Sequence, residues 1–98
     1  MRMMMTIKIP IEHGNRAYRD GSMTEVFANL AEQLQPEAMY FTMLNGLRGA
    51  IVVYDLKDGE EYRLMEIHEP LFEALGALIE EQPVLSRDDL QKAMTQAG

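Results

Sequence analysis

The chain has 98 residues, of which 47% are hydrophobic and 26% are charged, so residues 1–98 fit one globular domain. The 16 acidic and 9 basic residues give a formal charge of −7, which argues against general binding to nucleic acid or to anionic membranes. The absence of cysteine excludes disulfides and thiolate metal sites and is typical of a reducing compartment. We therefore expect a cytoplasmic protein with no nucleic-acid or membrane partner.

The N-terminal segment predicts a β-strand, because its apolar residues alternate with others from Met3 to Ile11. Pro10 lacks an amide donor and marks the end of the strand. Polar residues interrupt the apolar run too early for a signal peptide, and no stretch approaches the roughly 18 apolar residues that span a bilayer. The residues on one side of this strand are Met3, Met5, Ile7 and Ile9.

The segment over residues 12–21 is polar, and we expect it to be a loop. The first helix is predicted to begin at Ser22, because Ser22 and Glu25 have the spacing of a capping box. The helix should end before Pro36. Its apolar stripe consists of Val26, Phe27, Leu30, Ala31 and Leu34.

Residues 37–44 and 47–56 predict two strands of a hairpin, joined by Asn45-Gly46. Both turn residues tolerate positive φ, so a two-residue type I′ turn is expected. This turn pairs Leu44 with Leu47, Thr42 with Gly49, Tyr40 with Ile51 and Ala38 with Val53 on one face. On the opposite face it pairs Met43 with Arg48, Phe41 with Ala50 and Met39 with Val52.

The C-terminal part predicts a helix, a strand and a short final helix. Helical spacing covers residues 64–75, with Pro70 either kinking the helix or starting its second half, and Gly76 ends it. A strand follows over residues 77–82. Ser86 and Asp89 then have capping-box spacing before a short helix with apolar residues. Those residues are Leu90, Ala93 and Met94.

The resulting order, β-α-β-β-α-β, predicts an α+β, ferredoxin-like sandwich in which helices cover one face of a four-stranded antiparallel sheet. The short C-terminal helix is an addition to this fold. Because both faces of the central hairpin carry apolar side chains, one face would remain exposed in a monomer. We therefore expect a homodimer that packs sheet against sheet, with the alternative that the C-terminal helix covers the surplus surface.

The chain resembles the dimeric α+β barrel superfamily, in particular its small bacterial domains without an assigned activity. The resemblance covers nearly the whole chain and implies a barrel made of two ferredoxin-like protomers. It also implies a range of activities, from cofactor-independent monooxygenases and muconolactone isomerases to haem enzymes. The matching segments are Met5-Thr6-Ile7-Lys8-Ile9-Pro10, Pro36-Glu37-Ala38-Met39-Tyr40-Phe41, Glu69-Pro70-Leu71-Phe72 and Glu80-Glu81-Gln82-Pro83-Val84-Leu85.

One candidate site is the polar segment after the first strand, which has the only local excess of positive charge. Its two arginines could hold a carboxylate, phosphate or enolate through bidentate hydrogen bonds. The alternative is a solvated segment whose arginines pair weakly with surface acids. The candidate ligand-binding residues here are His13, Asn15, Arg16, Tyr18 and Arg19.

A second group of polar residues lies on the predicted strands and could place hydrogen bonds around a small ligand. The group consists of Lys8, Thr6, Tyr40 and Thr42. His68 lies on the apolar stripe of the second helix, where it could transfer protons or could be a core histidine with one satisfied nitrogen. His68-Glu69 lacks the second histidine of a zinc-protease helix, so no metal site is expected.

These observations predict a homodimeric α+β barrel protein that binds a small molecule or acts as an accessory module, without a cofactor. The alternative is a cofactor-independent monooxygenase- or isomerase-like enzyme acting on a small organic substrate. Its arginines would stabilise an enolate, and the proton would be moved by His13, His68 or Tyr40. A third possibility is a subunit whose sheet is covered by a different protein.

Overall fold

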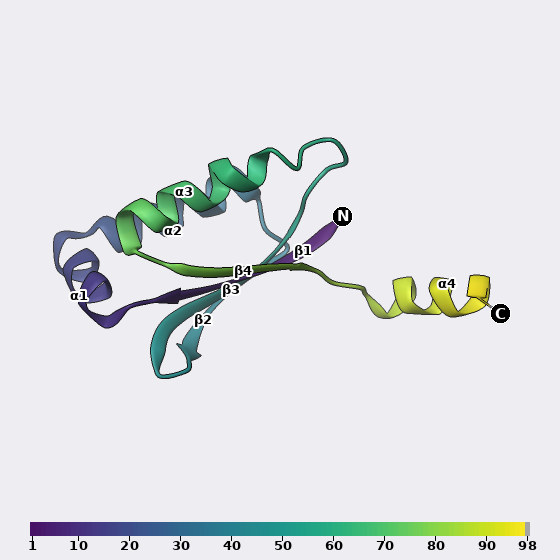
Figure 1. Cartoon of the computed structure of the whole chain (residues 1–98), viewed down its shortest axis with the longest axis horizontal. Helices are drawn as coiled ribbons and strands as arrows, with labels where there is room; N and C mark the ends of the chain where they lie inside the picture. The colour runs from purple at the N-terminus through teal and green to yellow at the C-terminus, as the bar shows by residue number, and fades with distance from the viewer. Residues whose placement is uncertain (98) are drawn as a thin grey trace.

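The computed structural model describes residues 1–97, and side chains for residues 1–96 (Figure 1). Two helices separate the first two strands, and the order of elements is βααββαβα. The elements are β1 (Arg2–Ile9), α1 (Ile11–Asp20), α2 (Ser22–Leu34), β2 (Ala38–Leu44), β3 (Leu47–Asp55), α3 (Arg63–Leu75), β4 (Leu78–Pro83) and α4 (Arg87–Ala97).

The four strands form one antiparallel sheet in the order β2-β3-β1-β4. This order is that of a ferredoxin-like fold, so the predicted α+β class and the extra C-terminal helix are confirmed. Helices α1, α2 and α3 lie on one side of the sheet, and no helix within residues 1–97 covers the other side (Figure 1). The two central strands, β1 and β3, therefore have one covered and one open face.

The hairpin has the predicted register. Leu44 pairs with Leu47, and the pairing continues to Ala38 with Val53. Asn45 and Gly46 have φ values of 52° and 78°, as a type I′ turn requires. The strands extend over residues 38–44 and 47–55, within one residue of the predicted bounds.

The core lies between the sheet and the helices. The inward residues of β1 are 0–6% exposed, and those of β3 from Ala50 to Tyr54 are 0–1% exposed. Full burial of an aliphatic side chain stabilises a fold by about 1.5–3 kcal/mol, so this alternation accounts for much of the stability. The buried hydrophobic residues from the helices are Ala17 of α1, Phe27 and Leu30 of α2, and Ile67, Leu71 and Leu75 of α3.

The expectation that residues 12–21 form a loop is wrong, because this segment is helix α1. Pro10 precedes the helix and Gly21 ends it in the left-handed conformation, with φ 83°, so both ends carry ordinary helix signals. The buried residues of α1 are Gly14 and Ala17. The face of α1 that packs on the core thus carries small residues. The sequence lacks the stripe of large apolar residues by which an amphipathic helix is predicted.

The capping box predicted at Ser22 and Glu25 is also wrong. Helix α2 begins at Ser22, its N-cap residue is Gly21, and no side chain caps it. The backbone N–H of Ser22 donates to Asp20 Oδ1 at 2.9 Å. Hydrogen bonds from Ser22 lower the pKa of the Asp20 carboxyl below its ordinary value.

Helix α3 extends to both sides of Pro70, so the proline lies inside the helix as expected and does not end it. Gly76 ends α3 as predicted, with φ 58° and its backbone N–H donating to the carbonyls of Leu71 and Phe72. Strand β4 begins at Leu78, one residue later than expected, and ends at Pro83.

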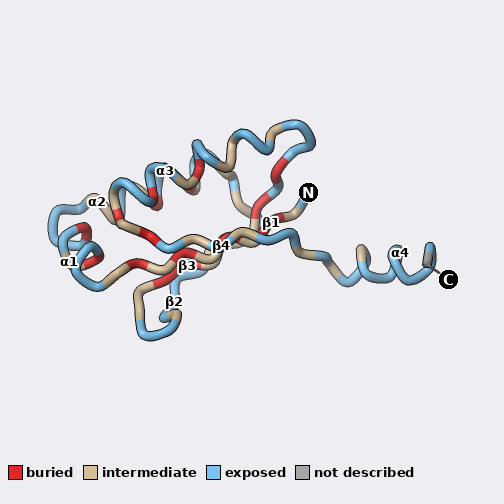
Figure 2. The backbone as a smooth tube through the Cα atoms, viewed as in Figure 1, coloured by how far each residue is buried: buried red, intermediate tan, exposed pale blue. Residues whose placement is uncertain are grey.

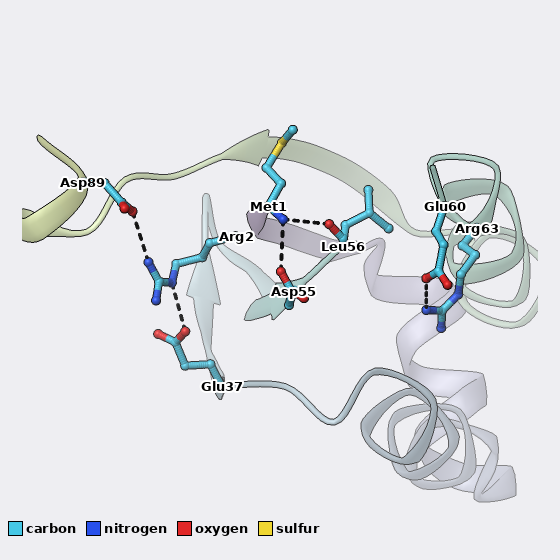
Figure 3. Close-up of polar contacts among 8 residues, drawn as sticks. All are labelled: Met1, Arg2, Glu37, Asp55, Leu56, Glu60, Arg63 and Asp89. Carbon is cyan, nitrogen blue, oxygen red and sulfur yellow. Dashed lines mark hydrogen bonds and ion pairs between the residues drawn. The ribbon is translucent and has the colours of Figure 1, made fainter. Parts of the chain in front are cut away.

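Helix α4 extends away from the rest of the molecule (Figures 1 and 2). The predicted capping box is confirmed, since Asp89 N–H donates to Ser86 Oγ at 3.1 Å and Ser86 N–H donates to Asp89 Oδ2 at 3.0 Å. Arg2 links α4 to the sheet, because its guanidinium contacts Asp89 at 3.4 Å and Glu37 at 2.9 Å (Figure 3). Leu90 and Met94 are 51% and 67% exposed, so α4 does not cover the open face.

The turn supplies a test of the hairpin register. We expect Gly46→Ala to lower the free energy of unfolding by about 1–2 kcal/mol, because an L-residue is strained at φ 78°. A Cβ at this position would meet no atom within 4 Å, so the loss comes from the backbone alone. Urea unfolding measures it. Asn45→Gly is the matched control, and equal losses in both variants would contradict the type I′ turn.

Candidate ligand cleft and polar cluster

An open cleft with a volume of about 440 Å³ lies between α2 and the β2–β3 hairpin. It forms because the helices do not fully cover edge strand β2: Phe41 and Met43 face the helix side but remain 61% and 65% exposed. The ring of Phe41 meets the ring of Phe27 edge to face, with centroids 5.1 Å apart. The lining residues are Ile9, Met23, Thr24, Phe27, Phe41, Thr42, Met43, Arg48 and Gly49.

Arg48 brings a charge to this otherwise apolar cleft. On β3 it alternates with the buried residues Ala50 and Val52, so it is on the helix side of the sheet. Its Nη2 donates to Asn15 Oδ1 on α1 at 2.9 Å. A Cβ added to Gly14 would lie 2.6 Å from Arg48 Nη1, so the absence of a side chain at Gly14 lets the guanidinium approach α1.

The cleft can bind an apolar molecule, but its lining offers little for acid–base chemistry. Its volume lies within the roughly 300–1,000 Å³ of small-molecule sites, which usually combine apolar walls with a few polar groups. Here the polar side chains are those of Arg48 and Thr24. The lining contains no histidine, tyrosine, aspartate or glutamate, the side chains that most often transfer protons in enzymes.

The predicted polar residues of segment 12–21 separate into two groups. Asn15 holds Arg48 beside the cleft. The others are exposed on α1, where they are not among the lining residues, and the ring of His13 packs against Gly76 at the end of α3. A Cβ on Gly76 would lie 2.7 Å from that ring. The exposed residues are His13, Arg16, Tyr18 and Arg19.

The predicted strand residues are also divided. Thr42 borders the cleft, although by register its side chain is on the same face of β2 as that of Tyr40. Tyr40, Lys8 and Thr6 lie on the open face of the sheet, where Thr6 and Tyr40 both pair with Ile51. The Lys8 ammonium lies 3.8 Å from Glu80 and donates to Asn45 Oδ1 at 3.4 Å.

His68 belongs to a polar cluster between α3 and the sheet. Its Nε2 lies 2.8 Å from Glu81 Oε1, and the Tyr54 hydroxyl donates to the same oxygen at 2.6 Å. Burial, followed by the hydrogen bond to Glu81, raises the pKa of Tyr54 far above its ordinary value, so the phenol keeps its proton. Glu81 Oε2 is buried without a hydrogen-bond partner among the described residues. The cluster thus has the geometry of a core histidine with one satisfied nitrogen.

The polar cluster and the cleft occupy different parts of the protein. Tyr54 and Gly49 are five residues apart on β3, which corresponds to about 17 Å along a strand. His68 and Tyr54 therefore do not lie within hydrogen-bonding distance of a ligand in the cleft. The polar cluster joins three elements of the fold, whereas the cleft is open to solvent.

Two residues that the sequence interpretation missed are Arg48 and Glu81. The sequence did contain a signal for Arg48, because the predicted hairpin pairing puts it on the same face of β3 as Ala50, Val52 and Tyr54. Glu81 follows Glu80, and only the pairing of β4 with β1 shows which one is inward: Glu81 lies opposite Met5. That pairing joins distant segments and leaves no local pattern.

Within residues 1–97, no helix is long and apolar enough to cross a bilayer. In the same part of the chain, no three histidine or acidic side chains gather as metal ligands would. No family model matches the sequence, and no curated protein is significantly similar to it. The resemblance to dimeric α+β barrels is therefore supported only by the ferredoxin-like fold.

The polar cluster predicts a stability effect. We expect Tyr54→Phe to lower the free energy of unfolding by about 1–3 kcal/mol, because it removes a donor from the partly buried Glu81 carboxylate. Urea unfolding measures the loss. Tyr62→Phe, at a 65% exposed position, should change the free energy by no more than about 0.5 kcal/mol. A similar small change in both variants would show that the hydrogen bond from the Tyr54 hydroxyl to Glu81 does not stabilise the fold.

Proposed function

We propose that this protein is a homodimeric small-molecule-binding module. In each protomer the cleft beside α2 takes the ligand, and the open faces of the two sheets pack against each other. The observation that carries the binding function is the cleft itself: nearly all its walls are apolar, and a single guanidinium lies among them. Apolar walls of this extent that face solvent are typical of sites that bind small molecules.

The lining favours binding over catalysis. A cofactor-independent monooxygenase or isomerase needs a group that takes or gives a proton next to its substrate. In the described residues, the histidine with a carboxylate partner lies in the polar cluster, and His13 is on the outside of α1. Tyr40 lies on the open face of the sheet, so none of the three catalytic candidates lines the cleft.

The open face of the sheet supports the homodimer. Apolar side chains from β2 and β3 form most of a patch on this face, and polar or charged side chains from β1 and β4 lie beside it. The polar side chains include Arg2, Lys8 and Glu80. The apolar residues are Met4, Ala38, Tyr40, Leu44, Leu47, Ile51, Val53 and Leu78.

The open face alone is small for a stable dimer interface, so we include α4 in the proposed interface. Eight residues of β1 and four strands give a face of about 27 by 19 Å, or roughly 500 Å². Stable complexes bury about 800 Å² on each partner. Helix α4 adds an arm about 16 Å long that carries exposed Leu90 and Met94. In the proposed dimer these residues pack against the second copy.

A variant that fills the cleft tests the binding function. We expect 2-naphthalenemethanol, a neutral apolar probe, to bind the wild type and to perturb the amide NMR signals of the cleft residues. Met23→Trp should abolish these changes, because the larger side chain occupies the cleft. Met65→Trp, at a 69% exposed site on the outer side of α3, should bind like the wild type. Equal binding by both variants would place the probe elsewhere and contradict the proposal.

A charge on the open face tests the dimer. We expect the wild type to be a dimer by light scattering at micromolar concentration and Ile51→Lys to be a monomer, because the lysine would be buried opposite an apolar face. Met65→Lys is the matched control on the helix side and should remain a dimer. Circular dichroism confirms that each variant is folded. A monomeric wild type would overturn the homodimer and favour a different protein as the partner.

A further inference from the structure

Arg48 differs from the other partly buried cations of this protein. Arg2, Lys8 and Arg63 each have a carboxylate oxygen within 4.0 Å. Arg48 is also partly buried, but none of the described residues forms an ion pair with it. In a chain with 16 acidic residues, an unpaired guanidinium at a partly buried position is a feature that requires an explanation.

The structure holds this guanidinium in one place and leaves part of it free. Asn15 accepts one hydrogen bond, and Gly14 allows Nη1 to lie against the backbone of α1. An arginine has five N–H donors. The donors of Arg48 that lack a protein partner are not fully buried, so a molecule entering from the solvent can reach them. A positioned arginine loses less conformational entropy on binding than a mobile surface arginine.

The surroundings of Arg48 select the rest of the ligand. The cleft walls include Ile9, Phe27, Phe41 and Met43, which favour an aliphatic or aromatic body. The edge-to-face pair of Phe27 and Phe41 presents aromatic surface to the cleft. With one cation and no metal ligand among the lining residues, the cleft can neutralise one negative charge.

We propose that the cleft binds a small organic monocarboxylate, whose carboxylate pairs with Arg48 and whose apolar body lies against Phe27 and Phe41. This inference rests on the proposed binding function and specifies the chemical class of its ligand. A planar carboxylate matches the fork of the guanidinium, and the apolar walls strengthen the pair by excluding water. Asn15 is then a positioning residue, because it holds the guanidinium and does not itself contact the ligand.

Matched acids and alcohols test the charge. The probes are 2-naphthoate with 2-naphthalenemethanol, and octanoate with octanol. We expect each acid to bind the wild type about tenfold more tightly than its alcohol, because only the acid forms a charge-assisted pair with Arg48. Isothermal titration calorimetry measures the affinities. The side-chain Nε–H NMR signal of Arg48 should shift with the acids and remain in place with the alcohols.

Two variants separate ligand binding from a purely structural role. Arg48→Gln should bind the acids only as tightly as the alcohols, and Arg48→Lys should recover part of the difference. Arg19→Gln, which removes an exposed arginine from α1, should match the wild type. If Arg48→Gln does not fold, the shift of the Arg48 Nε–H signal in the wild type tests whether the acids contact the guanidinium. Equal affinity for acids and alcohols would overturn this inference and leave the binding module intact, whereas no binding of any probe would overturn both.

Discussion

The position of β1 at the centre of the sheet is the constraint on which the rest of the structure depends. Its inward residues must alternate with outward ones, and both neighbouring strands must match that alternation. A slip by one residue would turn the buried Met5 and Ile7 to the open face. The same register also turns two charged residues inward, because Arg48 lies opposite Ile9 and Glu81 lies opposite Met5.

The protein accommodates these two inward charges in different ways. Glu81 lies under α3, where Tyr54 and His68 supply hydrogen bonds from two other elements. Arg48 lies where the helix layer ends, and its protein partner is a single neutral amide. One end of the core is therefore closed by a polar cluster, and the other stays open to solvent. The difference follows from how far α2 and α3 extend over the sheet.

Features set by neighbouring residues could be predicted from the sequence, and features set by distant pairing could not. The Asn45-Gly46 turn fixes the hairpin register, so all its pairs were predictable, and the capping box at Ser86 was recognised for the same reason. Helix α1 was missed because its inner face carries only Gly14 and Ala17. The cleft depends on the incomplete cover of β2, which no local pattern encodes. Arg48 could have been recognised as a candidate site residue, because it is a charged residue on a face of β3 that is otherwise apolar.

The run of methionines at the start of β1 places three identical thioethers in two environments. Met3 and Met5 are 6% and 0% exposed beneath the helices, whereas Met4 lies on the open face and is partly exposed. Oxidation of a thioether to the sulfoxide follows solvent access and makes the side chain polar. Met4 is thus the most solvent-accessible of the three, and in the proposed dimer a second copy would cover it. Oxidative chemistry at this position would link the assembly of the protein to the redox conditions around it.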